Sequence, residues 1–122
     1  MKYKTLSIVI PVFNEEEFIE KNINAVVGAD SLGLRKEIVI VDDCSMDKSR
    51  SIIRTLKIRD KKVVIKKIFK NKNEGKGSAL KMGFLKSTGD IVLVQDADLE
   101  YDPADYPLLL EPFLKNDADV VY

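Results

Sequence analysis

Apolar and polar residues follow one another in blocks along this chain of 122 residues. Short aliphatic runs are typical of buried strands, and the segments between them carry apolar residues at helical spacing. Strands are therefore predicted at residues 5–12, 37–41, 63–69, 90–95 and 118–121. Helices are predicted at about residues 14–28, 46–57, 78–87 and 103–113.

The alternation of strands with helices indicates right-handed βαβ units, and so an α/β fold with a mostly parallel sheet and helices on both faces. We expect the strand order 3-2-1-4, with the third strand near an edge because lysines flank it. The ends of the first, second and fourth strands then surround one crevice at the switch point of the sheet. Asn14 is predicted to cap the first helix, with acidic residues in the first turn behind it.

The most informative residues are the carboxylates that follow the aliphatic run 91–94. We expect this run to be a strand buried on both faces. Asp96 and Asp98 follow this run, and Glu100 comes two positions later. A buried strand does not tolerate unpaired carboxylates, so they should lie past its C-terminal end, where open α/β sheets bind ligands. Clustered carboxylates there suit Mg²⁺ or Mn²⁺ held in turn by phosphate oxygens. The pattern predicts phosphate-ester or sugar-nucleotide chemistry.

Two more acidic loops occupy the same topological position after the first and second strands. They are residues 14–16 and the pair Asp42 and Asp43. For residues 14–16, helix capping and ligand contact both remain open. One aspartate is enough to cap the second helix, so we favour ligand contact for the pair, with a nucleobase imide or a ribose hydroxyl as donor.

A glycine-containing loop at residues 73–78 precedes the third predicted helix. Glycines let backbone amides approach a ligand, and a helix N-terminus favours an anion. The loop is not a Walker A motif, because Lys70 stands five positions before Gly75 where a glycine is required. A plain turn with a cap and an anion-binding loop both remain open.

The net charge is zero, but the charges are unevenly distributed. Between Lys48 and Lys81 thirteen Lys or Arg face two acidic residues, whereas from Asp90 onward nine acidic residues face one lysine. The basic stretch is either a solvated face or a surface that attracts phosphates or acidic lipid. No nucleic-acid partner is expected, because basic and aromatic residues are not interleaved.

The chain contains one cysteine, Cys44, and no histidine, which excludes an internal disulfide, a zinc site and a Cys–His nucleophile pair. It has no apolar run of the ~18–20 residues that a membrane span needs, and no signal-peptide pattern. The cytoplasm is the expected compartment, with peripheral attachment at the inner face of the membrane.

Four motifs occur in order, and together they resemble one family. They read Ile-Pro-Val-Phe-Asn-Glu-Glu at 10–16, Val-Asp-Asp-Cys-Ser-Met-Asp at 41–47, Asn-Glu-Gly-Lys-Gly-Ser-Ala at 73–79 and Asp-Ala-Asp-Leu-Glu at 96–100. The set resembles the family 2 glycosyltransferases of GT-A fold. The longer form Gln-Asp-Ala-Asp-Leu-Glu-Tyr-Asp-Pro at 95–103 is similar to the polyprenyl-phosphate sugar transferases, such as dolichyl-phosphate mannose and glucose synthases.

The resemblance implies a Rossmann-like domain that binds a nucleotide sugar. Pro11, Phe13 and Glu15 would line the nucleotide. Asp42 and Asp43 would bind the base and the ribose. The base is uracil or guanine, since both present an imide N–H.

At the other end of the donor, Asp96, Ala97 and Asp98 would face the diphosphate. The resemblance implies that Asp96 and Asp98 are the catalytic carboxylates and that both, together with Glu100, are ligands of Mg²⁺ or Mn²⁺. Lys76 would lie near the donor.

The implied reaction is an inverting, metal-dependent transfer of a hexose from a UDP- or GDP-sugar, with a polyprenyl or dolichyl phosphate as the favoured acceptor. A lipid phosphate is already ionised at neutral pH and would need no catalytic base, unlike a hydroxyl acceptor. Family members continue beyond this length into a part that binds the acceptor. We therefore expect residues 1–122 to be the donor-binding part, with uncovered edges that favour homo-oligomers.

Other functions remain as alternatives. A family 2 transferase could act on a saccharide acceptor, and the chain could bind the donor without turnover. A phosphatase of the haloacid dehalogenase type also places Asp-X-Asp after a parallel strand, but on its first strand and without the glutamate found here at Glu100. Nucleotidyl transfer would need a Gly-rich, Arg-containing loop after the first strand, where this chain has Pro-Val-Phe-Asn-Glu-Glu.

Overall fold

The computed structural model describes residues 3–97 and 102–116. Asp98, Glu100 and the fifth strand predicted at 118–121 lie outside these residues. The elements, in chain order, are β1 (Thr5–Val12), α1 (Ile19–Gly28), β2 (Arg35–Asp42), α2 (Ser49–Thr55), β3 (Val63–Phe69), α3 (Lys76–Lys86), β4 (Ile91–Val94), the 3₁₀ helix η1 (Pro103–Asp105) and α4 (Tyr106–Asn116).

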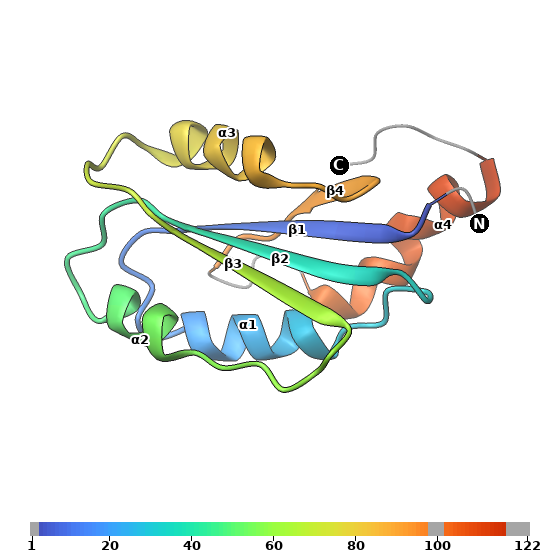
Figure 1. Cartoon of the computed structure of the whole chain (residues 1–122), viewed down its shortest axis with the longest axis horizontal. Coiled ribbons are helices and arrows are strands. Elements are labelled where there is room, and N and C mark those ends of the chain that lie inside the picture. The colour runs from blue at the N-terminus through green and yellow to red at the C-terminus, as the bar shows by residue number, and fades with distance from the viewer. Residues whose placement is uncertain (1–2, 98–101, 117–122) are drawn as a thin grey trace.

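The four strands form one parallel sheet in the order β3-β2-β1-β4. Helix α3 covers one face of the sheet, while α1, α2 and α4 lie against the other (Figure 1). The predicted strand order and the helices on both faces are confirmed. Because the strands are parallel, the loops after β1, β2 and β4 emerge at the same edge of the sheet.

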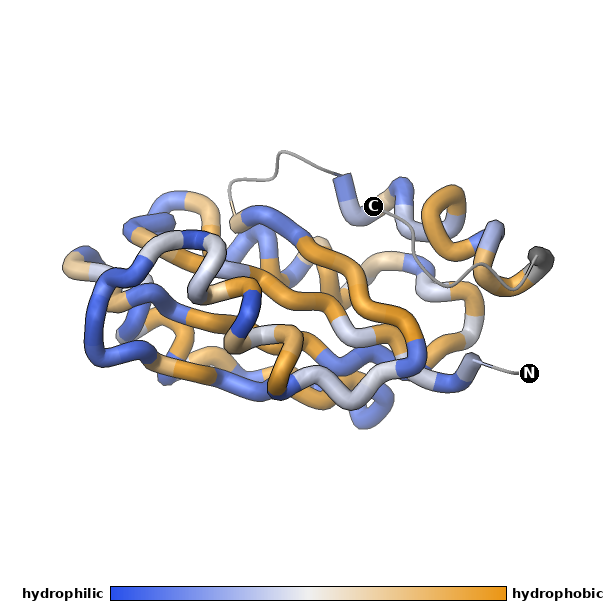
Figure 2. The backbone as a smooth tube through the Cα atoms, turned by 90° about the horizontal axis from the view of Figure 1, so that it is seen from above, coloured by the Kyte–Doolittle hydropathy of each residue, from blue (hydrophilic) through white to orange (hydrophobic). Residues whose placement is uncertain are grey.

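Strand alternation divides the interior into two cores. Every second residue of β1 and β2, including Ile8, Ile10, Ile38 and Ile40, packs against α1, α2 and α4. The residues between them, Val9, Val39 and Val41, pack with Ala79 of α3. The apolar strands lie at the centre and the polar connections outside them (Figure 2). This alternation also decides which residues after each strand face α3.

Two local predictions are wrong. Asn14 does not cap a helix: its φ of 52° is left-handed, and α1 begins only at Ile19, after Phe18. The loop after β2 holds Asn14 instead, through hydrogen bonds with Ser45 and Met46. Strand β4 is not buried on both faces, because Val92 and Val94 are exposed on the α3 side. Within the described residues β4 is an edge strand, and α3 does not extend over it.

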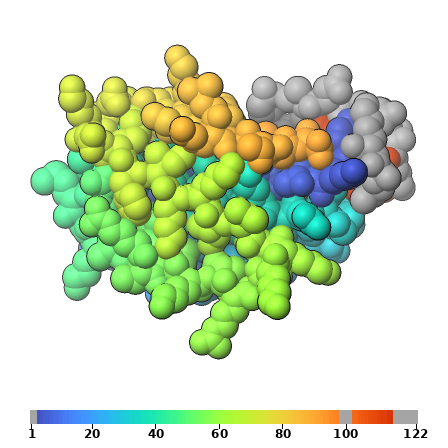
Figure 3. Space-filling view, in the orientation of Figure 1, coloured from blue at the N-terminus to red at the C-terminus, as the bar shows by residue number. Residues whose placement is uncertain are grey.

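Part of the basic stretch Lys48–Lys81 lies beside the other edge of the sheet, at β3. The connection between α2 and β3 contributes exposed basic residues, namely Lys57, Arg59, Lys61 and Lys62. Side chains of this lime-green segment project from the front of the molecule (Figure 3). Charge at an edge strand also disfavours pairing with other chains.

Gly83 sets how closely α3 approaches the sheet. A Cβ placed there would lie 2.3 Å from Cγ1 of Val9, a buried β-branched residue with little rotamer freedom. Gly83→Ala is expected to lower the free energy of unfolding by about 2 kcal/mol, as overpacking does. Thermal denaturation checks this. Gly77→Ala, on the same helix with nothing within 4 Å, should be neutral or stabilising.

Glu37 makes stability depend on pH at the opposite end of the sheet from the acidic loops. Burial raises the pKa of its carboxyl, but hydrogen bonds from Thr88, Ser7 and Lys66 outweigh this and lower the pKa from 4.5 to about 2. The stabilisation from Glu37 is thus complete above the pKa that its carboxyl has in the unfolded chain. It is lost as the pH falls through the lower pKa of the folded protein. Unfolding free energy should fall by about 2 kcal/mol between about pH 6 and about pH 3. Urea titrations at a series of pH values measure this, and the unfolding free energy of Glu37→Gln should fall less in acid than that of the parent.

Candidate functional site

A cavity of about 350 Å³ opens at the C-terminal ends of β1, β2 and β4, beside the N-terminus of α3. It is lined by Pro11, Val12, Phe13, Glu15, Asp43, Asn73, Gly75, Lys76, Ala79, Asp96 and Ala97. These residues come from all four sequence motifs. The structure thus brings together the predicted residues Pro11, Phe13, Glu15, Asp43, Lys76, Asp96 and Ala97.

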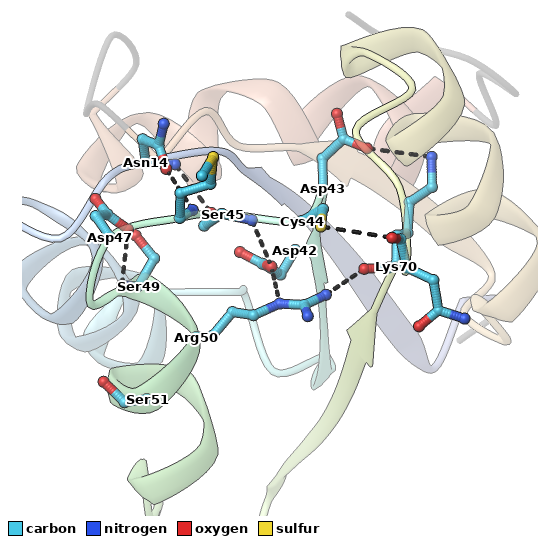
Figure 4. Close-up of polar contacts among 12 residues, drawn as sticks. Asn14, Asp42, Asp43, Cys44, Ser45, Asp47, Ser49, Arg50, Ser51 and Lys70 are labelled. Carbon is cyan, nitrogen blue, oxygen red and sulfur yellow. Dashed lines mark hydrogen bonds and ion pairs between the residues drawn. The ribbon is translucent and has the colours of Figure 1, made fainter.

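The loop after β1 forms one wall and is tied to the loop after β2. The N–H of Asn14 donates to Ser45 Oγ (2.9 Å), and Asn14 Oδ1 accepts from the N–H of Met46 (2.9 Å). Next along the chain, the N–H of Glu15 donates to Ser49 Oγ (2.9 Å). Figure 4 shows Asn14 facing Ser45 across the two loops. These bonds hold the wall in place and leave the ring of Phe13, 41% exposed, at the cavity.

The two aspartates at the end of β2 point to opposite faces of the sheet, as Figure 4 shows. Asp42 shares the face of Ile38 and Ile40, and Asp43 shares that of Val39 and Val41. Only Asp43 lines the cavity. Alternation along the strand therefore separates the functions of two neighbouring carboxylates that the sequence presents as a pair.

Asp42 is not brought to the cavity, so the contact with base or ribose expected for it has no support in this geometry. Its side chain is fully buried. Its Oδ2 accepts from Arg50 Nε (2.5 Å) and from the N–H of Ser45 (3.0 Å). Because Arg50 also donates to the carbonyl of Lys70, Asp42 organises the loop after β2 and joins it to the end of β3.

Asp43 joins the same loop to the glycine loop before α3. Its carboxylate accepts from the N–H groups of Glu74 (3.0 Å) and Gly75 (2.8 Å) and pairs with Lys70 Nζ (3.2 Å). Burial raises the pKa of Asp43, but these donors outweigh it and lower the pKa below its usual range. Burial likewise lowers the pKa of Lys70, and its pairs with Glu74 and Asp43 raise it overall. Both groups are therefore charged at neutral pH.

Lys70 is a residue that sequence reasoning missed. It follows an apolar strand at the same edge as the acidic loops, and this position was the available signal. Its side chain is buried and also donates to Ser78 Oγ (2.5 Å) on α3. Lys70 is thus the centre of the contacts that hold the glycine loop.

At the end of β4, Asp96 faces α3 and its Oδ1 pairs with Lys76 Nζ (2.5 Å). Lys76 is 58% exposed, whereas Asp96 is 14% exposed. Among the described residues no three His, Cys, Asp or Glu side chains lie close enough to hold a metal. The predicted ligands Asp98 and Glu100 fall outside those residues. The Asp96 carboxylate lines the cavity and already pairs with the ammonium group of Lys76. A carboxylate oxygen in this place is a suitable ligand for a hard divalent ion.

Comparison with known proteins identifies the family of this chain. The sequence model of glycosyl transferase family 2 matches residues 7–122. The chain belongs to glycosyl transferase family 2. Membership confirms the predicted resemblance to this family.

Among curated relatives, an undecaprenyl-phosphate 4-deoxy-4-formamido-L-arabinose transferase of Edwardsiella ictaluri is 39% identical over 113 residues, which is 89% of this chain and 34% of the relative. The chain spans about a third of the length of the curated relatives it matches. No helix within the described part of the chain is long and apolar enough to cross a membrane.

Two solved structures share the fold. A mannosyltransferase from Pyrobaculum calidifontis, in complex with GDP-Man and Mn²⁺, aligns with a TM-score of 0.70 and 27% identity, over 79% of this chain and 28% of that one. Glucosyl-3-phosphoglycerate synthase from Mycobacterium tuberculosis, in complex with Mn²⁺, UDP and glucosyl-3-phosphoglycerate, aligns with a TM-score of 0.69 and 26% identity. The alignment covers 92% of this chain and 40% of that one. The predicted GT-A fold is confirmed.

Proposed function

We propose that this chain is the donor-binding part of an inverting, metal-dependent glycosyltransferase. It would bind a UDP- or GDP-sugar and transfer the sugar to a polyprenyl phosphate. The observation that carries the proposal is the cavity formed by all four family motifs, with a carboxylate–ammonium pair, Asp96 and Lys76, at one end. The acceptor class is supported by the name of the Edwardsiella ictaluri relative.

The nucleoside is proposed to lie against Pro11, Phe13, Glu15 and Asp43. Pro11 and the exposed ring of Phe13 offer an apolar surface to a base. Asp43 is ionised, so its carboxylate is an acceptor for an imide N–H or a ribose hydroxyl. Asp43 also accepts hydrogen bonds from the N–H groups of Glu74 and Gly75. A nucleoside bound to Asp43 would therefore affect the position of the glycine loop.

The diphosphate is proposed to lie between Asp96 and Lys76. Asp96, together with Asp98 and Glu100, would hold Mg²⁺ or Mn²⁺, which when bound neutralises the nucleoside-diphosphate leaving group. Lys76, at the first position of α3, would release Asp96 and turn to the phosphate oxygens. The first amides of α3 would add to the attraction for the anion.

The acceptor phosphate is proposed to attack the anomeric carbon from the side opposite the leaving diphosphate, which inverts the configuration. A phosphate oxygen is already ionised at neutral pH, so this chain need supply no base. A lipid acceptor would bring the protein to a membrane surface from the cytoplasm, and the basic residues around β3 would favour an anionic surface there.

Titration calorimetry with UDP and GDP, each with and without Mn²⁺, tests this proposal. We expect one of the two nucleotides to bind, and its affinity to rise when Mn²⁺ is present. Thermal stability should rise with the same ligand pair, because binding to the native state stabilises it. A nucleotide affinity that does not change on adding Mn²⁺ would contradict the metal-dependent site.

A further inference from the structure

Three buried polar side chains lie behind the end of β4, on the face of the sheet that α1 and α4 cover (Figure 1). Asn22 of α1 and Gln95 are fully buried, and Tyr106 of α4 is 2% exposed. The surrounding core is made of aliphatic and aromatic residues. Polar groups in such a place are costly unless they are hydrogen-bonded, so their partners are informative.

These side chains converge on one peptide group. Tyr106 Oη donates to Gln95 Oε1 (2.9 Å). Asn22 Nδ2 donates to the carbonyl of Asp96 (2.9 Å), and Gln95 Nε2 makes a longer contact with the same carbonyl (3.5 Å). The N–H of Gln95 donates to the carbonyl of Val9 (2.9 Å), which ties this segment to β1. The backbone of Asp96 is thus held from behind, while its side chain faces the cavity.

Packing alone does not explain Asn22. Its Oδ1 is buried and has no partner in the part of the chain that the structure describes. Leucine has a similar size and would avoid the cost of this orphaned acceptor. What asparagine adds is the Nδ2 donor to Asp96. Burial also raises the pKa of Tyr106, so its hydroxyl remains a proton donor at neutral pH.

We propose that Asn22, Gln95 and Tyr106 are positioning residues that fix the Asp96 peptide and so aim its carboxylate at the cation in the donor cavity. This inference rests on the proposed function, because the orientation of the Asp96 carboxylate matters only if that carboxylate binds the metal. A metal ligand has a productive geometry only when groups behind it hold its orientation. The three side chains would act through Asp96 and touch neither donor nor metal.

The test compares Asn22→Leu and Tyr106→Phe with the parent chain, using calorimetry with UDP and GDP in the presence and absence of Mn²⁺. Loss of an outer-shell partner typically weakens a metal site by about 10- to 100-fold, and we expect the Mn²⁺-dependent gain in nucleotide affinity to fall on that scale. The metal-free affinity should not change. Thermal stability of Asn22→Leu should stay close to that of the parent, because removal of the orphaned Oδ1 offsets the donor that the Asp96 carbonyl loses. A purely structural role would not combine unchanged stability with a weaker metal response.

Ile23→Val on the same helix is the matched control, since it thins the same core without touching Asp96. It should cost about 1 kcal/mol of stability and leave the Mn²⁺ response as in the parent. A parent without any Mn²⁺ response overturns the proposed function and this inference together. A responsive parent with unchanged responses in Asn22→Leu and Tyr106→Phe overturns this inference alone. An equal loss in Ile23→Val overturns it as well, because general loosening of the core would then explain the effect.

Discussion

Arg50→Leu is expected to lower the free energy of unfolding by about 3 kcal/mol, because it strands a buried carboxylate. Asp42 is fully buried, and Arg50 Nε lies 2.5 Å from its Oδ2. Without the guanidinium, Asp42 keeps only the N–H of Ser45 among the donors described here. The carbonyl of Lys70 loses its donor too. Thermal denaturation should show Tm lower by roughly 10–20 °C for a domain of this size.

Arg54→Leu is the matched control on the same helix. Arg50 and Arg54 both lie over the ring of Phe69, at 5.4 Å and 5.0 Å from its centroid. Arg54 is exposed and does not pair with Asp42, so its replacement should cost about 0.5–1 kcal/mol, the scale of an exposed cation–π contact. Arg50→Lys should fall between the two, because an ammonium does not reproduce the fork that reaches Asp42 and Lys70. Equal losses in Arg50→Leu and Arg54→Leu would contradict a structural role for the Asp42 pair.

The sheet and its order followed from the sequence because continuous apolar runs and the helices between them leave few topologies. The same runs concealed which way each side chain points. A strand that is apolar on both faces shows no alternation in hydropathy, so Asp42 and Asp43 looked equivalent. Counting by twos from Val39 would have assigned Asp43 to the α3 face, but the identity of that face required the helix packing seen in the structure.

Asn14 illustrates a second limit of sequence reasoning. Asparagine before three glutamates is a strong local signal for a helix start. In the folded chain its neighbours are Ser45 and Met46, more than thirty residues away, and these contacts stabilise a left-handed residue instead. Long-range partners of this kind, like those of Lys70 and Asn22, have no local signature. Local propensity therefore located the site but not the contacts that hold it.

Asp96→Asn is expected to abolish the response of nucleotide binding to Mn²⁺ and, at the same time, to strengthen binding without metal. The first effect follows because an amide is a poor ligand for a hard cation. Binding of one ligand typically changes the affinity for a coupled ligand by about 5- to 150-fold, and we expect Mn²⁺ to lose this effect on the nucleotide. The second follows because a negative charge beside the diphosphate is removed and Lys76 is released from its 2.5 Å pair. Calorimetry with UDP and GDP, with and without Mn²⁺, measures both effects.

Asp60→Asn is the control for the change in charge. Asp60 is exposed and precedes β3, at the end of the sheet away from the cavity, and an amide oxygen can still accept from the N–H of Lys62. It should leave both affinities as in the parent. The opposite signs are what make Asp96→Asn decisive: a folding defect weakens binding in both conditions, whereas loss of a metal ligand weakens it only with Mn²⁺. If Asp96→Asn keeps the Mn²⁺ response of the parent, Asp96 does not hold the metal, and other groups must hold it.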